Sequence, residues 1–202
     1  SDIQFLKSLS KREIICGYGE ILKHSLIDNK KFFIFLDKNL KKILSLSSPF
    51  IEKAIYKSCK IKKKIVEKDE KEKALRKVLN FGHTFAHAYE AGLGYSHKLN
   101  HGEAVILGMK TALNFSLREN MLSKNEYNLI INHIDNSGLP SSIKKYFSIK
   151  DLNKILSFMI KDKKNNSEKI NLVLLKKIGK PLINRKYSKE KLGLFMKKIL
   201  TN

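Results

Sequence analysis

Residues 72–90 of this chain read EKALRKVLNFGHTFAHAYE, and residues 100–103 read NHGE. If Lys73–Ala91 forms one helix, a polar stripe recurs on one face, because an α-helix has about 3.6 residues per turn. The stripe consists of Glu72, Arg76, Asn80, His83, His87 and Glu90. The opposite face carries the apolar residues Leu75, Val78, Leu79, Phe85 and Tyr89. A guanidinium, an amide and two imidazoles on one face indicate the wall of a site that holds an anion or a metal ion.

Two histidines of this stripe have a spacing that suits metal binding. His83 and His87 stand four residues apart, so both imidazoles of one helix could bind one ion. On this spacing alone, two buried and hydrogen-bonded histidines are at least as good an interpretation. The metal interpretation gains support from His101, because Asn100 and Glu103 have capping-box spacing and place it in the first turn of another helix.

A further candidate ligand, Glu20, lies just beyond Gly17 and Gly19 in an expected helix over residues 11–27. Glycine lets another backbone or a ligand approach closely. From this segment alone, an ordinary surface ion pair is the simpler interpretation of Glu20 and Lys23. Three nitrogen or oxygen ligands with an open fourth position are typical of a catalytic zinc site. The other histidines, His24, His97 and His133, are expected to be surface or loop residues.

The residues expected around the metal predict the charge of its ligand. They are Arg76, Asn80, Lys23 and one or more of Lys62, Lys63 and Lys64. Guanidinium binds carboxylate or phosphate through two parallel hydrogen bonds, and ammonium supplies a compact positive charge. The site therefore predicts a small, multiply anionic, hydroxylated substrate, without identifying the molecule.

The 202 residues include 41 Lys and Arg against 19 Asp and Glu, a formal net charge of +22. Clustered positive charge would favour nucleic-acid binding, but the lysines are spread over every segment, so no nucleic-acid partner is expected. Cys16 and Cys59 are isolated, which argues against a disulfide framework and a cysteine zinc site. No apolar run approaches the about 20 residues of a membrane span. With no signal-like start, a cytoplasmic protein without membrane contact is expected.

The pattern along the chain predicts a mainly α-helical protein of one domain, residues 1–202, with a short C-terminal β-hairpin. The segment INLVLL (170–175) is the best strand candidate, with a partner near residues 182–185. No glycine-rich dinucleotide-binding fingerprint is present. Helices are expected at residues 11–27, 28–47, 51–69, 73–91, 104–120, 122–135, 151–161 and 189–200.

Two sequence blocks carry a resemblance to a known family. They are R-x-x-L-N-F-G-H-x-x-x-H-A-x-E at residues 76–90 and H-G-E-A-V-x-x-G-M at residues 101–109. Together they closely resemble the C-terminal domain of the 3-dehydroquinate synthase family. Three further blocks match in the same order: FLKSLSKREIICGYGEILK (5–23), KIVEKDEKEKALR (64–76) and DKK (162–164) before a strand that ends in Ile-Gly.

This resemblance implies a role for each residue of the site. The metal ligands would be Glu20, His83 and His101. His87 would then be a proton-transfer residue instead of a ligand, and Glu72 the other acid/base residue. Substrate contacts would come from Lys23, Lys62, Arg76, Asn80 and either Lys163 or Lys164, and NAD contacts from Phe5 and Ser8.

The family converts 3-deoxy-D-arabino-heptulosonate 7-phosphate to 3-dehydroquinate and phosphate in the shikimate pathway, with NAD and Zn²⁺ or Co²⁺. The resemblance therefore implies an anionic sugar-phosphate substrate and a homodimer of the full-length protein. The family's N-terminal NAD-binding α/β domain is absent from residues 1–202, so the chain is expected to fold but not to turn over substrate unaided. Alternatives are another sugar-phosphate cyclase, a metal-dependent polyol dehydrogenase, or a non-catalytic basic helical binding module.

Overall fold

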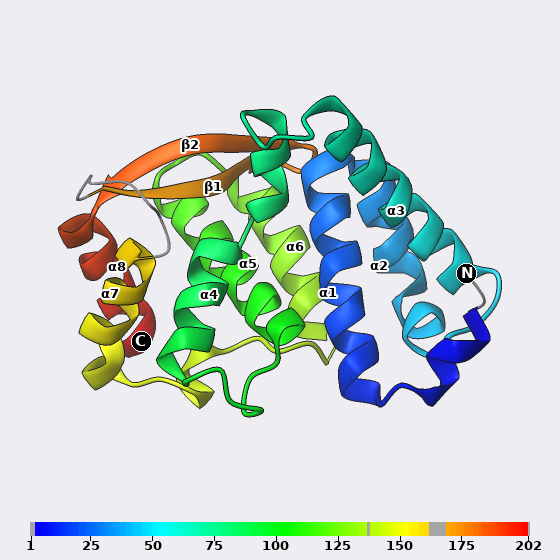
Figure 1. The fold of residues 1–202 in the computed structure, drawn as a ribbon, viewed down its shortest axis with the longest axis horizontal. Coiled ribbons are helices and arrows are strands. Elements are labelled where there is room, and N and C mark those ends of the chain that lie inside the picture. Colours follow the sequence, from blue (N-terminus) through cyan, green and yellow to red (C-terminus); the bar gives the residue numbers. More distant parts are fainter. Residues whose placement is uncertain (1–2, 137, 162–168, 202) are drawn as a thin grey trace.

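The computed structural model describes residues 3–136, 138–161 and 169–201. Within these ranges the fold is mainly α-helical with one C-terminal β-hairpin (Figure 1), as the sequence predicts. No helix in these ranges is long and apolar enough to cross a membrane. The α-helices are α1 (Lys11–Asp28), α2 (Lys30–Leu44), α3 (Phe50–Lys68), α4 (His83–Gly92), α5 (His101–Arg118), α6 (Lys124–Asn136), α7 (Leu152–Lys161) and α8 (Lys189–Thr201). The 3-10 helices are η1 (Ile3–Ser8), η2 (Leu75–Asn80), η3 (Ile143–Lys145) and η4 (Ile149–Asp151).

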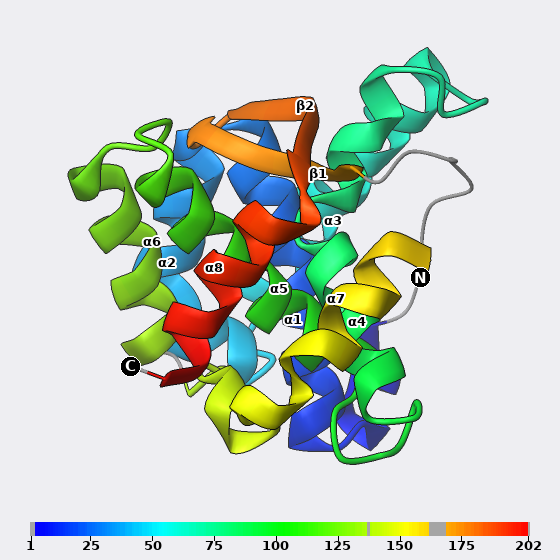
Figure 2. The same cartoon turned by 90° about the vertical axis from the view of Figure 1, so that its left-hand side faces the viewer.

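Helix α5 lies at the centre of the molecule. Its residues are buried on nearly all sides, because α1 and α4 pack against it and β1 covers part of it. A helix that is apolar all round is typical of a buried position. Helices α2 and α3 pack on α1 to one side (Figure 1), and α7 and α8 lie together on the face turned to the viewer in Figure 2. Helix α5 therefore packs against both α1 and α4.

The hairpin consists of β1 (Lys169–Lys177) and β2 (Lys180–Ser188), which pair antiparallel. The predicted pairing is confirmed, since Leu172 lies opposite Arg185 and Leu174 opposite Leu182. In Figure 1 the hairpin runs above the helices, from α8 toward α1. The backbone N–H of Gly179, in its turn, donates a hydrogen bond of 2.8 Å to a carbonyl at the end of α1. The hairpin thereby closes one end of the helical body.

The predicted single helix over Lys73–Ala91 is wrong. The segment forms two elements, η2 and α4, which are separated by Phe81 and Gly82. Gly82 has a φ of +84°, a backbone conformation that glycine adopts without steric cost. A Cβ at this position would also lie 2.7 Å from the backbone nitrogen of Met109 in α5. Gly82 therefore lets the chain turn while it lies against α5, and α4 begins at the next residue.

Asp69 organises the loop that precedes η2. Its carboxylate accepts hydrogen bonds from the backbone N–H groups of Lys73, Ala74 and Arg76, at 2.9, 2.8 and 2.9 Å. These bonds, led by that from Arg76, lower the pKa of Asp69. Residues 69–76 are folded around one side chain, so the helical period of the sequence does not continue into α4.

Candidate metal centre

Helix α1 carries a carboxylate and an ammonium group that contact each other. The Lys23 ammonium donates hydrogen bonds of 2.9 and 2.8 Å to the two carboxylate oxygens of Glu20. The Lys23 side chain is only 3% exposed, so the interpretation as an ordinary surface ion pair is wrong. Burial lowers the pKa of Lys23, although Glu20 counteracts this effect. Burial opposes ionisation of Glu20, but the charge and hydrogen bonds of Lys23 outweigh it and lower the pKa of Glu20.

Glycines allow α5 to approach α1 next to Glu20. A Cβ at Gly19 would lie 3.0 Å from the Ile106 side chain and 3.1 Å from the carbonyl oxygen of Gly102. A Cβ at Gly102 would lie 2.4 Å from the Cα of Cys16. The close approach that the sequence predicts is confirmed at Gly19, whereas a Cβ at Gly17 would meet nothing within 4 Å. The first turn of α5 therefore rests on α1.

Two histidines begin helices α4 and α5. His83 is the first residue of α4, after Gly82, and His101 is the first residue of α5, as its capping spacing predicts. The Glu103 carboxylate accepts a hydrogen bond of 2.9 Å from the backbone N–H of Asn100, which closes the first turn of α5. Both imidazoles therefore project from helix starts, which are well-defined points of the backbone.

The structure brings Glu20, His83 and His101 together from three helices. One potential ligand atom of each residue lies within 4.8 Å of those of the other two. The ring centroid of His87 lies 5.5 Å from that of His83 and 6.2 Å from that of His101. His87 therefore borders the cluster. Two imidazoles and one carboxylate are donors that suit a zinc or cobalt ion.

His83 is a neutral imidazole at neutral pH. Burial, assisted by the positive charge of Lys23, lowers the pKa of His83 to about 4. Its Nδ1 atom lies 3.4 Å from the carbonyl oxygen of Phe81, which suits a weak hydrogen bond from a protonated Nδ1. The lone pair is then on Nε2. A neutral imidazole with one available lone pair is the form that binds metal ions.

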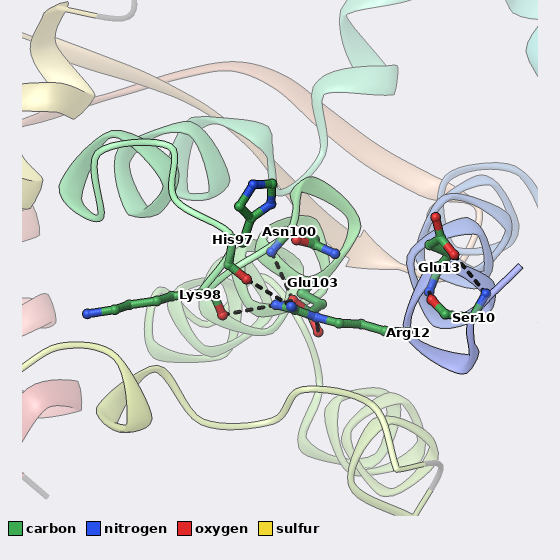
Figure 3. Close-up of polar contacts among 7 residues, drawn as sticks. All are labelled: Ser10, Arg12, Glu13, His97, Lys98, Asn100 and Glu103. Carbon is green, nitrogen blue, oxygen red and sulfur yellow. Dashed lines mark hydrogen bonds and ion pairs between the residues drawn. The ribbon is translucent and has the colours of Figure 1, made fainter.

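Arg12 ties the start of α5, and the segment before it, to α1 (Figure 3). Its guanidinium donates hydrogen bonds of 2.8 and 2.6 Å to the two carboxylate oxygens of Glu103. It also donates to the carbonyl oxygens of His97 and Lys98, at 2.8 and 3.0 Å. Bidentate pairing of arginine with carboxylate adds geometric specificity to the electrostatic attraction. Because Glu103 also accepts from the N–H of Asn100, this ion pair fixes the first turn of α5.

The residues before His83 form a second group of polar side chains. The Glu72 carboxylate accepts a hydrogen bond of 2.6 Å from the Asn80 side-chain amide. Glu72 has a φ of +53°, a strained conformation of the kind that clusters at functional sites. The Arg76 guanidinium donates a hydrogen bond of 2.6 Å to the carbonyl oxygen of Glu70. The predicted stripe on a single helix is therefore replaced by a loop and η2, in which Glu72 and Asn80 still meet.

The other predicted residues lie at the edges of this region or outside it. Lys62 is exposed on α3, and its charge contributes to the lowered pKa of Lys23. In η1, Phe5 is 76% exposed and the Ser8 hydroxyl donates a hydrogen bond of 2.8 Å to the Phe5 carbonyl oxygen. Lys163 and Lys164 lie outside the described residues.

Two histidines that the sequence places at the surface or in loops are buried, so that prediction was wrong. The Nδ1 atom of His24 lies 2.6 Å from the Ser58 hydroxyl. The His133 ring lies between the Tyr18 hydroxyl and the Asp37 carboxylate, each 2.8 Å from a ring nitrogen. Burial lowers the pKa of both histidines, that of His24 to about 4. Both occupy core-facing positions of their helices, where buried partners hold them.

The sequence did not reveal the roles of Arg12, Glu103 and Glu90. The first two are 91 residues apart, and no local spacing predicts such a pair. One signal was available, since Arg12 is one of only four arginines among 41 basic residues, and arginine is the residue that binds carboxylate in a bidentate manner. The Glu90 carboxylate contacts the Nδ1 atom of His101, and its place in the polar stripe was the available signal.

Comparison with known proteins gives consistent matches. The family described as 3-dehydroquinate synthase C-terminal matches residues 17–165. The 3-dehydroquinate synthase of Pelagibacter ubique (strain HTCC1062) is 63% identical over 201 residues, which are 100% of this chain and 55% of that protein. The 3-dehydroquinate synthase of Thermodesulfovibrio yellowstonii (strain ATCC 51303 / DSM 11347 / YP87) is 39% identical over 95% of this chain and 52% of that protein. The chain thus spans about half the length of these curated relatives.

Solved structures share the fold. A 2-epi-5-epi-valiolone synthase from Streptomyces hygroscopicus subsp. jinggangensis 5008, with NAD⁺ and Zn²⁺ bound, matches with a TM-score of 0.84 at 18% identity, over 98% of this chain and 54% of that chain. A 2-deoxy-scyllo-inosose synthase complexed with carbaglucose-6-phosphate, NAD⁺ and Co²⁺ matches with a TM-score of 0.81 at 22% identity, over 96% and 54%. At these identities the matches establish the shared fold alone.

Proposed function

This chain belongs to the 3-dehydroquinate synthase C-terminal family, and we propose that it forms the metal- and substrate-binding part of a 3-dehydroquinate synthase. The observation that carries this proposal is the convergence of Glu20, His83 and His101, whose potential ligand atoms lie within 4.8 Å of one another. The names of the two curated relatives support the same reaction. The product would be 3-dehydroquinate, formed with phosphate from 3-deoxy-D-arabino-heptulosonate 7-phosphate.

Glu20, His83 and His101 would hold one divalent ion. Two imidazoles and a carboxylate accept zinc or cobalt, and the related solved structures contain Zn²⁺ or Co²⁺. Bound there, the ion would act as a Lewis acid toward hydroxyl and carbonyl oxygens of the substrate. The neutral state of His83, which its lowered pKa ensures, leaves this ligand ready to bind at neutral pH.

The surrounding cations would bind the anionic groups of the substrate. Lys23 is buried beside Glu20, where an ammonium charge is weakly screened by water. Arg76 and Asn80 lie in η2, directly before the turn that leads to His83. Preorganised positive charge next to a metal ion stabilises carboxylate and phosphate groups. Lys62 on α3, with Lys163 or Lys164, would complete the set.

Two residues are proposed for proton transfer. His87 lies one helical turn after His83 and its ring lies beside those of His83 and His101, so a proton could be exchanged next to the metal-bound atoms of the substrate. Glu72 is the second acid/base residue, with its carboxylate oriented by the amide of Asn80. Imidazole and carboxylate groups are common general acids and bases.

NAD would be the second cofactor, with contacts from Phe5 and Ser8 in η1. The exposed aromatic ring of Phe5 suits stacking on a planar group. Since the curated relatives are about twice as long as this chain, we expect their remaining part to provide the other NAD contacts. The 202-residue chain should then bind metal without turning over substrate. Homodimerisation, cytoplasmic location and the absence of a nucleic-acid partner stay predictions from the sequence.

A fusion protein tests this function directly. The chain is joined to the part of the Pelagibacter ubique relative that it does not cover, a reasonable junction at 63% identity. With NAD and Zn²⁺, we expect the fusion to release phosphate from 3-deoxy-D-arabino-heptulosonate 7-phosphate and to form 3-dehydroquinate. In the same fusion, His87→Ala should lower kcat by at least about 100-fold.

The product distinguishes the alternatives. A folded, metal-loaded fusion that forms no 3-dehydroquinate would contradict the proposal. Formation of a valiolone or an inosose from a sugar phosphate would instead assign the chain to another sugar-phosphate cyclase. Full activity of the 202-residue chain alone, with NAD and metal, would show that its predicted dependence on a second part is wrong.

A further inference from the structure

A carboxylate outside the proposed ligand set contacts one of the ligands. The Glu90 oxygens lie 3.1 and 3.2 Å from the Nδ1 atom of His101. The Glu90 side chain is 12% exposed, whereas the His101 side chain is 53% exposed. Glu90 is therefore held by the protein around it, in the last turn of α4, while the imidazole stands largely in solvent at the start of α5.

This contact decides which ring nitrogen of His101 carries the proton. An ionised carboxylate can only accept hydrogen bonds, so the contact requires a proton on Nδ1. In the neutral imidazole the lone pair is then on Nε2. Within the described ranges, the Glu90 carboxylate contacts this ring at Nδ1, while the rings of His83 and His87 lie beside it with centroids 5.6 and 6.2 Å away. Glu90 thus sets both the tautomer and the direction of His101.

Charge balance gives Glu90 a second effect. The carboxylate of Glu20 is paired with the buried ammonium of Lys23, which offsets its negative charge before a cation arrives. Glu90 adds a negative charge in direct contact with the His101 ring, at its Nδ1 atom. A carboxylate that accepts from the outer nitrogen of a histidine ligand raises the basicity of the nitrogen that binds the metal.

We propose that Glu90 is the positioning residue of the metal centre, fixing His101 with Nδ1 protonated and Nε2 available to the ion. This inference rests on the proposed function, because it assumes that His101 binds a metal. It goes further by assigning part of the metal affinity of the chain to a residue outside the ligand set. The contact of His83 with the Phe81 carbonyl, at 3.4 Å, is longer and uncharged, so the stronger outer contact belongs to His101.

The experiment measures Zn²⁺ and Co²⁺ affinity of the 202-residue chain by competition with a chromophoric chelator. Glu90→Gln keeps the size of the side chain and removes its charge, and we expect it to weaken binding by about 10-fold to 100-fold. The matched control is Glu119→Gln. Glu119 is 15% exposed and pairs with Lys191. It caps the C-terminal end of α5, opposite to the end that carries His101, so its replacement should leave metal affinity unchanged.

Each result has one meaning. The inference is overturned if Glu90→Gln changes the metal affinity by less than about threefold, which is well below the loss expected for an outer-contact residue. Failure of the wild-type chain to bind metal would instead refute the proposed metal centre. If Glu90→Gln does not fold, nitrogen-15 NMR of the metal-free wild-type chain decides, at a pH where His101 is neutral. A proton on Nδ1 of His101 is expected, and a predominant proton on Nε2 would overturn the inference.

Discussion

On α1, the buried charge of Lys23 acts on the neighbouring His24. His24 follows Lys23 directly, is 4% exposed, and has its Nδ1 atom 2.6 Å from the Ser58 hydroxyl. Burial and then the charge of Lys23 lower its pKa from 6.5 to about 4. Protonation of His24 would place a second positive charge in the core beside Lys23, so the folded state excludes that proton.

We predict that acid destabilises the protein through His24. The unfolded chain binds a proton near pH 6.5 and the folded chain only near pH 4, so this contribution to stability is complete above pH 6.5 and is lost as the pH falls toward 4. The full difference amounts to at most about 3 kcal/mol. Between pH 6.5 and 4, the free energy of unfolding measured in urea should fall less steeply with decreasing pH for His24→Gln than for wild type. Equal slopes would contradict the prediction.

The sequence predicted which residues form the site better than it predicted whether their side chains are buried. The candidates Glu20, His83 and His101 do converge, but the residue spacing also offered His87, which only the family resemblance removed from the ligand set. Burial was not predictable for Lys23 and His24, because a lysine or histidine within a helix is buried or exposed according to what packs against it. Those partners come from α3 and α5, far away in the sequence.

At the scale of elements, the positions where helices begin decide where the imidazoles lie. Hydrophobic period and capping residues predicted α1 and α5, and a β-branched, leucine-rich run predicted the hairpin, because these signals are local. The same period failed at residues 73–91, where Asp69 and Gly82 interrupt it. A glycine in a helical pattern does not reveal whether another element packs against it. The interruption at Gly82 could therefore not be predicted without knowing that α5 lies against this residue.

Replacement of Gly82 tests this break. Gly82→Ala adds a methyl group at a φ of +84° and 2.7 Å from the Met109 backbone nitrogen. Gly94→Ala is the matched control, since Gly94 has a φ of +67° but open space around it. We expect the control to lose about 1 kcal/mol of unfolding free energy from backbone strain, and Gly82→Ala to lose about 2 kcal/mol more from overpacking. Equal losses in denaturant unfolding would show that contact with α5 is unimportant.

At the scale of the whole molecule, the site exists only because α1, α4 and α5 are held in one arrangement. Arg12 contributes through the ion pair that joins α1 to the start of α5 (Figure 3), and the hairpin closes the opposite end of α1. Neither contact could be found from the sequence, because each joins segments that are distant along the chain. The mainly helical fold with its C-terminal hairpin could be predicted, and solved structures with high TM-scores share it.

We predict that loss of the Arg12 ion pair weakens both the fold and metal binding. Arg12→Met leaves the Glu103 carboxylate, which is 10% exposed, without its bidentate partner, and we expect a loss of about 1 to 3 kcal/mol in unfolding free energy. Lys191→Met removes a comparable pair with Glu119, a carboxylate that is 15% exposed. Metal titration should show weaker binding for Arg12→Met and unchanged binding for Lys191→Met. Equal affinities in the two variants would refute a role for Arg12 at the metal centre.

The most direct test of the account is metal titration of the chain and four single variants. We predict that the wild-type chain binds one Zn²⁺ or Co²⁺ ion. Substitution of any one of the three ligands, in Glu20→Gln, His83→Ala or His101→Ala, should weaken binding by at least about 100-fold, about 2.7 kcal/mol. The fourth variant, His87→Ala, should bind the ion as wild type does. The account is contradicted if the wild-type chain binds no metal ion. It is also contradicted if His87→Ala weakens metal binding while His101→Ala leaves it unchanged.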